Sequence, residues 1–301
     1  MRSRSPGRRL RTTWLAACMA CATAMVDVIA GVGAPQGPTF RTSVDLVTVG
    51  VSVRRNGRPV RGLDVGDFTL LDNGIAQPIV ALSYETLPID LSVVLDVSGS
   101  VTGPVIAQLR RAVDDVRRSL RQQDRLRVIT FNTAIQRVVD FGDPSTAIAA
   151  AFSDLRPGGG SAVFDALALA LASGSQPDRR HLVILFSDGR DGSSIGTPDT
   201  LLAVARATTP TVFVVLATPA RLPSDRVYAD LAAQTGGRVV SLLPTESLGN
   251  SLRSALEQFR STYVLTYAPT GVERTGDHAL EVRVNQPGLE VRARRGYAIG
   301  H

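Results

Sequence analysis

Three polar residues follow an apolar run at alternate positions in the stretch LSVVLDVSGSV, which contains Asp96, Ser98 and Ser100. They could form an ordinary turn, or they could supply oxygen ligands for a hard metal ion. Two further segments place oxygens in a similar setting. Ser161 follows three glycines in PGGGSAVFDAL, and Asp188 ends the apolar run HLVILFSDG.

The mixture of two carboxylates and three hydroxyls favours one class of ion. Mg²⁺ takes about six oxygen ligands, and Mn²⁺ and Ca²⁺ also accept oxygen. The set contains no His or Cys, which argues against zinc. If the hydroxyls bind directly and the acids act through water, the protein only partly neutralises the ion. The ion then favours an anionic ligand, such as a carboxylate of another protein.

These residues need a sheet that brings distant segments to one edge. The strand IDLSVVLDV is continuously apolar, as in a strand covered on both faces. Strand-like runs follow at RLRVITF, QRVVDF, HLVILFSD, TVFVVLA and GRVVSLL, and helical segments are predicted at 104–120, 162–173, 198–207, 224–235 and 246–260. This alternation predicts an α/β fold with a doubly wound, mostly parallel sheet and helices on both faces. Ligands bind such sheets beyond the carboxyl ends of the strands.

Short connections and period-two patterns mark the other strands. RLRVITF and QRVVDF are too close for a crossover helix, so one is predicted to be an antiparallel edge strand. Val47 to Val53 alternate apolar and polar residues, and Asn56-Gly57 signals a hairpin turn. Alternation returns after Tyr263, where residues 280–293 predict a second hairpin.

The period-two alternation near both ends of the chain predicts a smaller, sandwich-like β module. Both ends contribute strands to it, and the α/β domain is inserted between them. Its expected parts are an export signal at 1–34, the N-terminal part of the β module at 40–87, the α/β domain at 88–262, and a hairpin at 263–299 that completes the module.

The three oxygen-bearing segments together resemble the metal-ion-dependent adhesion site of von Willebrand factor type A domains, over about residues 88–262. The resemblance implies that Ser98, Ser100 and Ser161 ligate the metal directly, and that Asp96 and Asp188 act mainly through water. The family most often has Thr where Ser161 stands, which implies a weaker site here. The flanking segments resemble the exported bacterial subgroup typified by acidobacterial members.

The N-terminus predicts export to the periplasm, cell envelope or extracellular space. A basic segment, MRSRSPGRRLR, precedes the apolar run TTWLAACMACATAMV. Asp27 interrupts a stretch already too short to span a membrane, so no transmembrane span is expected in the mature chain. LAAC also resembles a lipobox, which makes a lipid anchor at Cys18 an alternative. Cys18 and Cys21 are the only cysteines, so no disulfide is expected in the folded part.

Charge does not indicate a nucleic-acid partner. The net charge is +6, but five arginines and one acid before residue 35 contribute +4 of it. The basic residues of the rest are interspersed with acids, and all of them are Arg. We therefore expect a protein partner that offers an acidic residue, and no nucleic acid.

Simpler roles compete for some of these polar residues. Ser161 precedes a predicted helix and could be its N-cap. Asp191 is expected to be a solvated loop acid, and Asp165 to support the first turn of its helix. Asn132 is either a support for the metal site or a turn former. Leu248, Leu252, Leu256 and Phe259 form an apolar stripe on the last predicted helix and are expected to be core, with a regulatory helix as the alternative.

An enzyme is not expected. The only histidines are His181, His278 and His301, and none forms a recognisable triad order with the serines. GGGSA lacks the lysine of a phosphate-binding loop. The expected function is a divalent-metal-dependent protein-binding module. The alternatives are a structural cell-envelope assembly module with a weak or inactive metal site, and a metal-dependent hydrolase.

Overall fold

The computed structural model describes residues 46–99, 103–174, 176, 178–217, 224–243 and 245–300. The predicted export signal, Cys18, Cys21 and the candidate ligand Ser100 lie outside these residues. No helix in the described ranges is long and apolar enough to cross a membrane.

A six-stranded sheet forms the centre of the α/β part. Its strands are β6 (Ile89–Asp96), β7 (Arg125–Phe131), β8 (Ile135–Val139), β9 (Arg180–Ser187), β10 (Thr211–Leu216) and β11 (Arg238–Ser241). Their order is β11-β10-β9-β6-β7-β8, and every pair is parallel except β7 with β8. The predicted doubly wound, mostly parallel sheet with an antiparallel edge strand is therefore confirmed.

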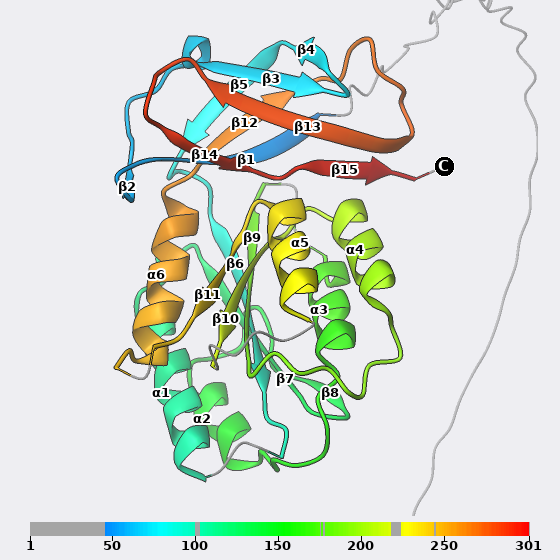
Figure 1. Cartoon of the computed structure of the whole chain (residues 1–301). Coiled ribbons are helices and arrows are strands. Elements are labelled where there is room, and N and C mark those ends of the chain that lie inside the picture. Colours follow the sequence, from blue (N-terminus) through cyan, green and yellow to red (C-terminus); the bar gives the residue numbers. More distant parts are fainter. Residues whose placement is uncertain are drawn as a thin grey trace, which may run out of the picture. The chain divides into compact units, whose positions relative to one another are not determined.

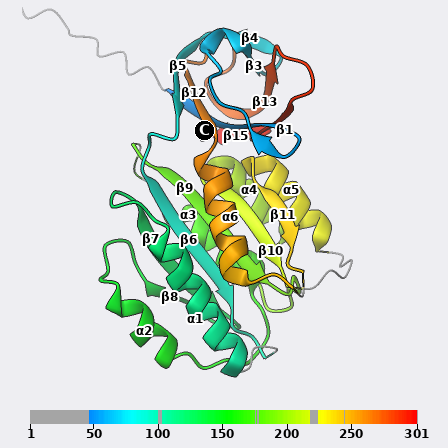
Figure 2. The same cartoon turned by 90° about the vertical axis from the view of Figure 1, so that its left-hand side faces the viewer.

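Helices cover both faces of this sheet. They are α1 (Gly103–Arg118), α2 (Thr146–Ser153), α3 (Val163–Ala172), α4 (Pro198–Ala207), α5 (Asp225–Thr235) and α6 (Leu248–Arg260). Helices α1, α2 and α6 bury their apolar faces on one side, and α3, α4 and α5 on the other (Figures 1 and 2). All eight residues of β6 are buried, including Asp90, Ser92 and Asp96, so the strand is covered on both faces but is mainly, not continuously, apolar.

Two antiparallel layers form the β module. One has the order β14-β1-β12-β5 with β2 beside β1, and the other has the order β15-β13-β3-β4. The bounds are β1 (Val47–Arg55), β2 (Arg58–Pro59), β3 (Phe68–Asp72), β4 (Ile75–Gln77), β5 (Ile79–Tyr84), β12 (Tyr263–Tyr267), β13 (Gly276–Val284), β14 (Glu290–Ala293) and β15 (Gly296–Ile299), with a 3₁₀ turn, η1 (Val65–Asp67). Strands from both ends of the chain therefore share each layer, as in a sandwich.

The prediction that residues 280–293 form a hairpin is wrong. β13 pairs with β3 and β15, while β14 pairs with β1 in the other layer (Figure 1). Each strand has one apolar face, and a two-stranded hairpin would leave that face uncovered. By crossing between the layers through residues 285–289, the chain places apolar side chains of both strands against the shared core.

A hydrogen-bonded polar cluster lies in the core of the sandwich. The Asp72 carboxylate accepts hydrogen bonds from the hydroxyls of Tyr267 at 2.7 Å and Tyr297 at 2.9 Å, and lies 2.9 Å from Nδ1 of His278. A buried carboxylate is tolerated only where such partners replace water. These residues come from β3, β12, β13 and β15, so the cluster joins the two layers.

Candidate metal site

The predicted site lies at the carboxyl edge of the parallel sheet. Asp96 is the last residue of the central strand β6, and Ser98 follows it; both are buried. Asp188 follows the neighbouring strand β9 and is partly exposed. Because β6 and β9 are paired in parallel, their carboxyl ends meet at the same edge.

Asp96 is used within the protein to hold this edge together. Its Oδ1 accepts a hydrogen bond from the backbone N–H of Ser98 at 2.9 Å, and its Oδ2 accepts one from the hydroxyl of Ser187 at 2.7 Å. Ser187 Oγ also accepts the N–H of Gly189 at 3.0 Å. Asp96 therefore connects the segment after β6 to the end of β9.

Sequence reasoning missed Ser187. It is fully buried and directly precedes Asp188 at the end of β9. The sequence feature that could have identified it is a hydroxyl residue at the end of a strand predicted to be buried, because a buried hydroxyl needs a hydrogen-bond partner. Its partner Asp96 is 91 residues away in sequence, so only the fold could identify the pair.

The glycine-rich loop packs backbone to backbone against the segment after β6. Gly99 N–H donates to the Gly159 carbonyl at 3.0 Å, and Gly158 N–H donates to the Val97 carbonyl at 3.1 Å. Gly158 and Gly159 have φ values of +148° and +74°, which favour glycine. A side chain on Gly160 would collide with the hydroxyl of Ser193. The positive φ angles of Gly158 and Gly159 are therefore the reason why glycine is favoured at this close approach.

Ser161 follows these glycines and is held by its backbone. Its carbonyl accepts the N–H groups of Gly192 at 3.0 Å and Ser193 at 3.1 Å, which ties it to the loop after Asp188. Its side chain does not cap α3. That role belongs to Asp191, whose carboxylate accepts the N–H of Val163 at 2.7 Å, and to Ser194, whose hydroxyl accepts the N–H of Phe164 at 3.0 Å.

The structure also assigns roles to the other polar residues singled out in the sequence. Asp191 is a helix cap rather than a purely solvated acid. Asp165 accepts the N–H groups of Ile195 and Gly196, each at 2.8 Å, so it fixes the loop after β9 as well as lying in the first turn of α3. Asn132 accepts the N–H of Ala134 at 2.8 Å and is a turn former.

The hydroxyls of Ser98 and Ser161 differ from that of Ser187 in having no protein partner. Across the described residues, neither hydroxyl makes a hydrogen bond, and the only bond to the Asp188 carboxylate is from the Arg190 N–H to Oδ1 at 3.0 Å. Neither hydroxyl oxygen is fully enclosed, so both can be reached by a ligand from solvent. These oxygens therefore suit a hard cation, which takes hydroxyl and carboxylate oxygen.

The carboxylates near this edge of the sheet also act on a neighbouring tyrosine. The pKa of the Tyr228 hydroxyl is raised, first by burial and then by the negative charges of Asp191, Asp188 and Asp96. Tyr228 also donates to the Gly189 carbonyl at 3.1 Å, which fixes the loop after β9 on helix α5. Clusters of three or more His, Cys, Asp or Glu side chains are not found among the described residues.

Several solved structures are similar to this chain over part of its length. A von Willebrand factor type A protein from Catenulispora acidiphila is 13% identical with a TM-score of 0.49, and the match covers 87% of this chain and 76% of that one. Proximal thread matrix protein 1 from the mussel byssus, solved with a zinc-occupied metal-site motif, is 15% identical with a TM-score of 0.49; the match covers 62% of this chain and 49% of the mussel chain. An aerotolerance-related membrane protein from Bacteroides fragilis is 15% identical with a TM-score of 0.44, over 57% of this chain and 98% of that one.

No curated protein sequence matches the chain. The model of the von Willebrand factor type A domain matches residues 90–248, which is more than half of the 301 residues. The matched segment begins in β6 and ends at the start of α6, so it spans the six-stranded sheet and all three candidate metal-site segments. The chain therefore belongs to the von Willebrand factor type A domain family.

Proposed function

We propose that the type A domain of this chain binds a divalent cation and, through it, a carboxylate of a partner protein. One observation carries the proposal. The hydroxyls of Ser98 and Ser161 lie in loops that are tied to the same edge of the sheet, yet neither is used in the protein's own hydrogen bonding across the described residues.

The hydrogen bonds of each residue suggest its role. Ser98 and Ser161 would ligate the cation directly, together with Ser100, which lies outside the described residues. Both oxygens of Asp96 accept hydrogen bonds from the protein, which supports an indirect role through water. Asp188 keeps one oxygen without a protein partner in the described ranges and would also act mainly through water.

A hydroxyl-rich set leaves the charge of a bound cation only partly neutralised. Mg²⁺ is the cation we expect, with Mn²⁺ or Ca²⁺ as alternatives. When bound, the cation would supply a position that favours an anionic oxygen, such as a partner's Asp or Glu. We therefore propose a binding protein and not an enzyme.

We also propose that the protein is exported to the periplasm, cell envelope or cell surface. The support is the basic and then apolar composition of residues 1–34. Intact mass measurement of the mature protein tests this. Cleavage after Ala24, Ala30 or Ala34 is the expected result, an acylated Cys18 would show the lipid-anchored alternative, and an uncleaved N-terminus would contradict export by this route.

Partner capture tests the binding function. Tagged protein is incubated with native envelope extract, with Mg²⁺ or with a chelator, alongside the Ser98→Ala variant. We expect one or more partners to be retained only with Mg²⁺ and only by the wild-type chain. Retention that is equal with chelator would contradict the mechanism and favour the structural-module alternative. Metal-dependent turnover of an ester or phosphate would favour a hydrolase.

A further inference from the structure

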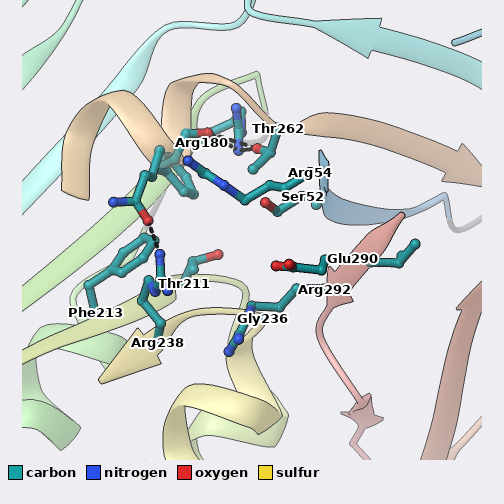
Figure 3. Close-up of a pocket in the computed structure, with 14 residues that line it drawn as sticks. Ser52, Arg54, Arg180, Thr211, Phe213, Gly236, Arg238, Thr262, Glu290 and Arg292 are labelled. Atoms are coloured by element: carbon teal, nitrogen blue, oxygen red, sulfur yellow. Dashed lines mark hydrogen bonds between the residues drawn. The ribbon is translucent and has the colours of Figure 1, made fainter. Parts of the chain in front are cut away.

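A second polar site lies at the opposite end of the central sheet from the candidate metal site. It is a pocket of about 310 Å³ where the amino ends of β9, β10 and β11 meet β1 and β14 of the sandwich (Figure 3). Arg180, Thr211 and Arg238 are the first residues of their strands. Ser52, Arg54, Glu290 and Arg292 line it from the sandwich side.

The charged lining of this pocket is strongly unbalanced. It holds the side chains of Arg54, Arg180, Arg238 and Arg292 and a single carboxylate, Glu290, which points into the pocket in Figure 3. Some buried arginines elsewhere in the described chain pair with carboxylates, as Arg179 does with Asp90 at 2.6 Å, while others such as Arg294 donate only to backbone carbonyls. None of the four pocket arginines has such an ion pair among the described residues.

Neutral groups satisfy part of the hydrogen-bonding capacity of these arginines. Arg180 donates to the Phe259 carbonyl at 2.9 Å and to the Thr262 hydroxyl, and Arg292 donates to the Gly237 carbonyl at 3.1 Å. Arg238 donates to the side-chain oxygen of Gln258. These contacts fix the positions of the guanidinium groups but do not compensate their charges.

Arg180 is held by two hydrogen bonds and by a ring contact. Its guanidinium carbon lies 4.0 Å from the centre of the Phe259 ring, and its two hydrogen bonds come from the same side of the pocket. Burial, and then the charge of Arg260, lower its pKa to about 10, so it stays protonated at neutral pH. Burial, and then Arg238, lower the pKa of Arg292. An anion bound among these arginines would reduce the repulsion between their positive charges.

We propose that this pocket binds a small oxyanion of charge −2 or more, either a phosphate compound or a polycarboxylate. Arginine forks match the geometry of both kinds of oxygen group. The volume is at the lower end of the range for small-molecule sites. The ligand would touch Arg180 and Arg238 of the α/β domain and Arg54 and Arg292 of the sandwich, so it would join the two parts.

This site is separate from the metal site and does not depend on the proposed function. It is tested on the full chain in buffer free of divalent metal. Pyrophosphate and citrate are titrated separately by calorimetry, and their relative affinities distinguish a phosphate ligand from a carboxylate ligand. We expect saturable binding of at least one probe at one site per chain.

Variants locate the site. Removing one charged donor with Arg180→Gln or Arg238→Gln is expected to weaken binding about tenfold or more, because hydrogen bonds to charged groups contribute most. Glu290→Gln removes the opposing charge and is expected to tighten binding about threefold. Arg253→Gln, at an exposed position on α6 outside the pocket, is the matched control and is expected to bind as the wild type does.

The proposal is overturned if neither probe binds saturably, or if Arg238→Gln and Arg253→Gln bind equally. Circular dichroism shows whether Arg180→Gln is folded. If Arg180→Gln is unfolded, the affinity of Glu290→Gln for the two probes tests the proposal instead. Glu290→Gln removes no donor and no buried charge, so tighter binding supports the site and unchanged or weaker binding contradicts it.

Discussion

At the scale of single residues, Ser161 is the most informative position in the candidate metal site. Its backbone carbonyl is held by two N–H groups, and its side chain makes no hydrogen bond to any described residue. The α3 cap, which was the competing role for this serine, is provided by Asp191 and Ser194. The structure therefore leaves this hydroxyl available to a ligand.

Replacing Ser161 tests this directly. Ser161→Ala is expected to reduce Mg²⁺ affinity about tenfold or more, because one direct ligand is lost. Ser161→Thr is expected to bind at least as tightly as the wild type, since the extra methyl restricts the side-chain rotamer. Calorimetric titration measures both. Ser153→Ala, which removes an exposed hydroxyl on α2, is the control, and an equal affinity for Ser161→Ala and Ser153→Ala would contradict the assignment.

His181 makes the stability of the sheet sensitive to pH. It is buried on β9, where its Nε2 lies 2.9 Å from the Ser92 hydroxyl, and burial lowers its pKa to about 4. The unfolded chain binds this proton near pH 6.5 and the folded chain does not, so stability decreases as pH falls from about 6.5 to about 4. The difference between the folded and unfolded pKa values of His181 corresponds to a decrease of about 3 kcal/mol in the free energy of unfolding.

Urea unfolding at pH 7 and pH 4.5 measures this effect. We expect His181→Gln to lose less stability than the wild type over this interval, because glutamine does not titrate. Carboxylates with lowered pKa that do not interact with His181, such as Asp67, contribute equally to both proteins and cancel in the comparison. Parallel pH profiles for the two proteins would show that His181 is not responsible.

Sequence reasoning identified which loops carry the candidate ligands but not the bonds between the loops. Asp96, Ser98 and Asp188 were found because polar residues at the end of a buried strand are a local pattern, and Ser161 because it follows three glycines and precedes a predicted helix. Ser187 and the capping role of Asp191 were missed because their partners lie 91 and 28 residues away. A hydrogen bond of that span depends on the strand order, which single residues do not reveal.

At the scale of elements, local chemistry made some segments predictable. Helix α4 occupies residues 198–207, as predicted, because Thr197 caps its N-terminus and Pro198 follows at the first helical position. The Asn56-Gly57 turn was predictable because both residues adopt positive φ, 51° and 75°, as its hairpin type requires.

Other elements could not be read from the sequence. Helix α2 was missed because its eight residues, TAIAAAFS, are too few and too uniformly small to show a clear amphipathic period. β4 is only three residues long. The alternation in 280–293 predicted strands correctly but not their neighbours, since one apolar face fits any layer that covers it.

The cap of α3 links helix stability to the candidate metal site. Asp191 belongs to the loop after Asp188 and accepts the N–H of Val163 at the start of α3. Asp191→Ala is expected to cost about 1 kcal/mol of folding stability, as loss of a helix cap usually does. Because the same loop holds Ser161 through Gly192 and Ser193, Mg²⁺ affinity should fall as well.

Denaturant unfolding without metal and calorimetry with Mg²⁺ measure the two effects of Asp191→Ala. Asp199→Ala, in the first turn of α4 and outside this loop, is the matched control. A stability loss without any change in metal affinity would show that the loop after β9 does not position the candidate ligands.

At the scale of the whole chain, the sandwich is completed only when the C-terminal strands return to the N-terminal ones. β12 pairs with both β1 and β5, so the sandwich cannot form from residues 46–87 alone. All six strands of the central sheet, in contrast, lie within the predicted domain 88–262. That division into domains stays a prediction, which these pairings support.

A fragment of residues 88–262 tests the division. We expect it to fold with a lower melting temperature than the full chain, since it loses contacts such as the hydrogen bond from Arg294 to the Thr208 carbonyl at 3.0 Å. Its Mg²⁺ affinity is expected to stay within about threefold of the full chain, because distant sites act nearly independently. An unfolded fragment by circular dichroism would mean that the domain depends on the sandwich.

The most direct test of the metal site is a calorimetric titration of the metal-free full chain with Mg²⁺ and with Mn²⁺, repeated for Ser98→Ala and Asp96→Ala. We expect one ion per wild-type chain, and about tenfold or greater weakening in each variant while circular dichroism shows an unchanged fold. Isotherms that are the same for the wild type and Ser98→Ala, or the absence of any binding by the wild type, would contradict a cation site at the carboxyl edge of β6 and β9.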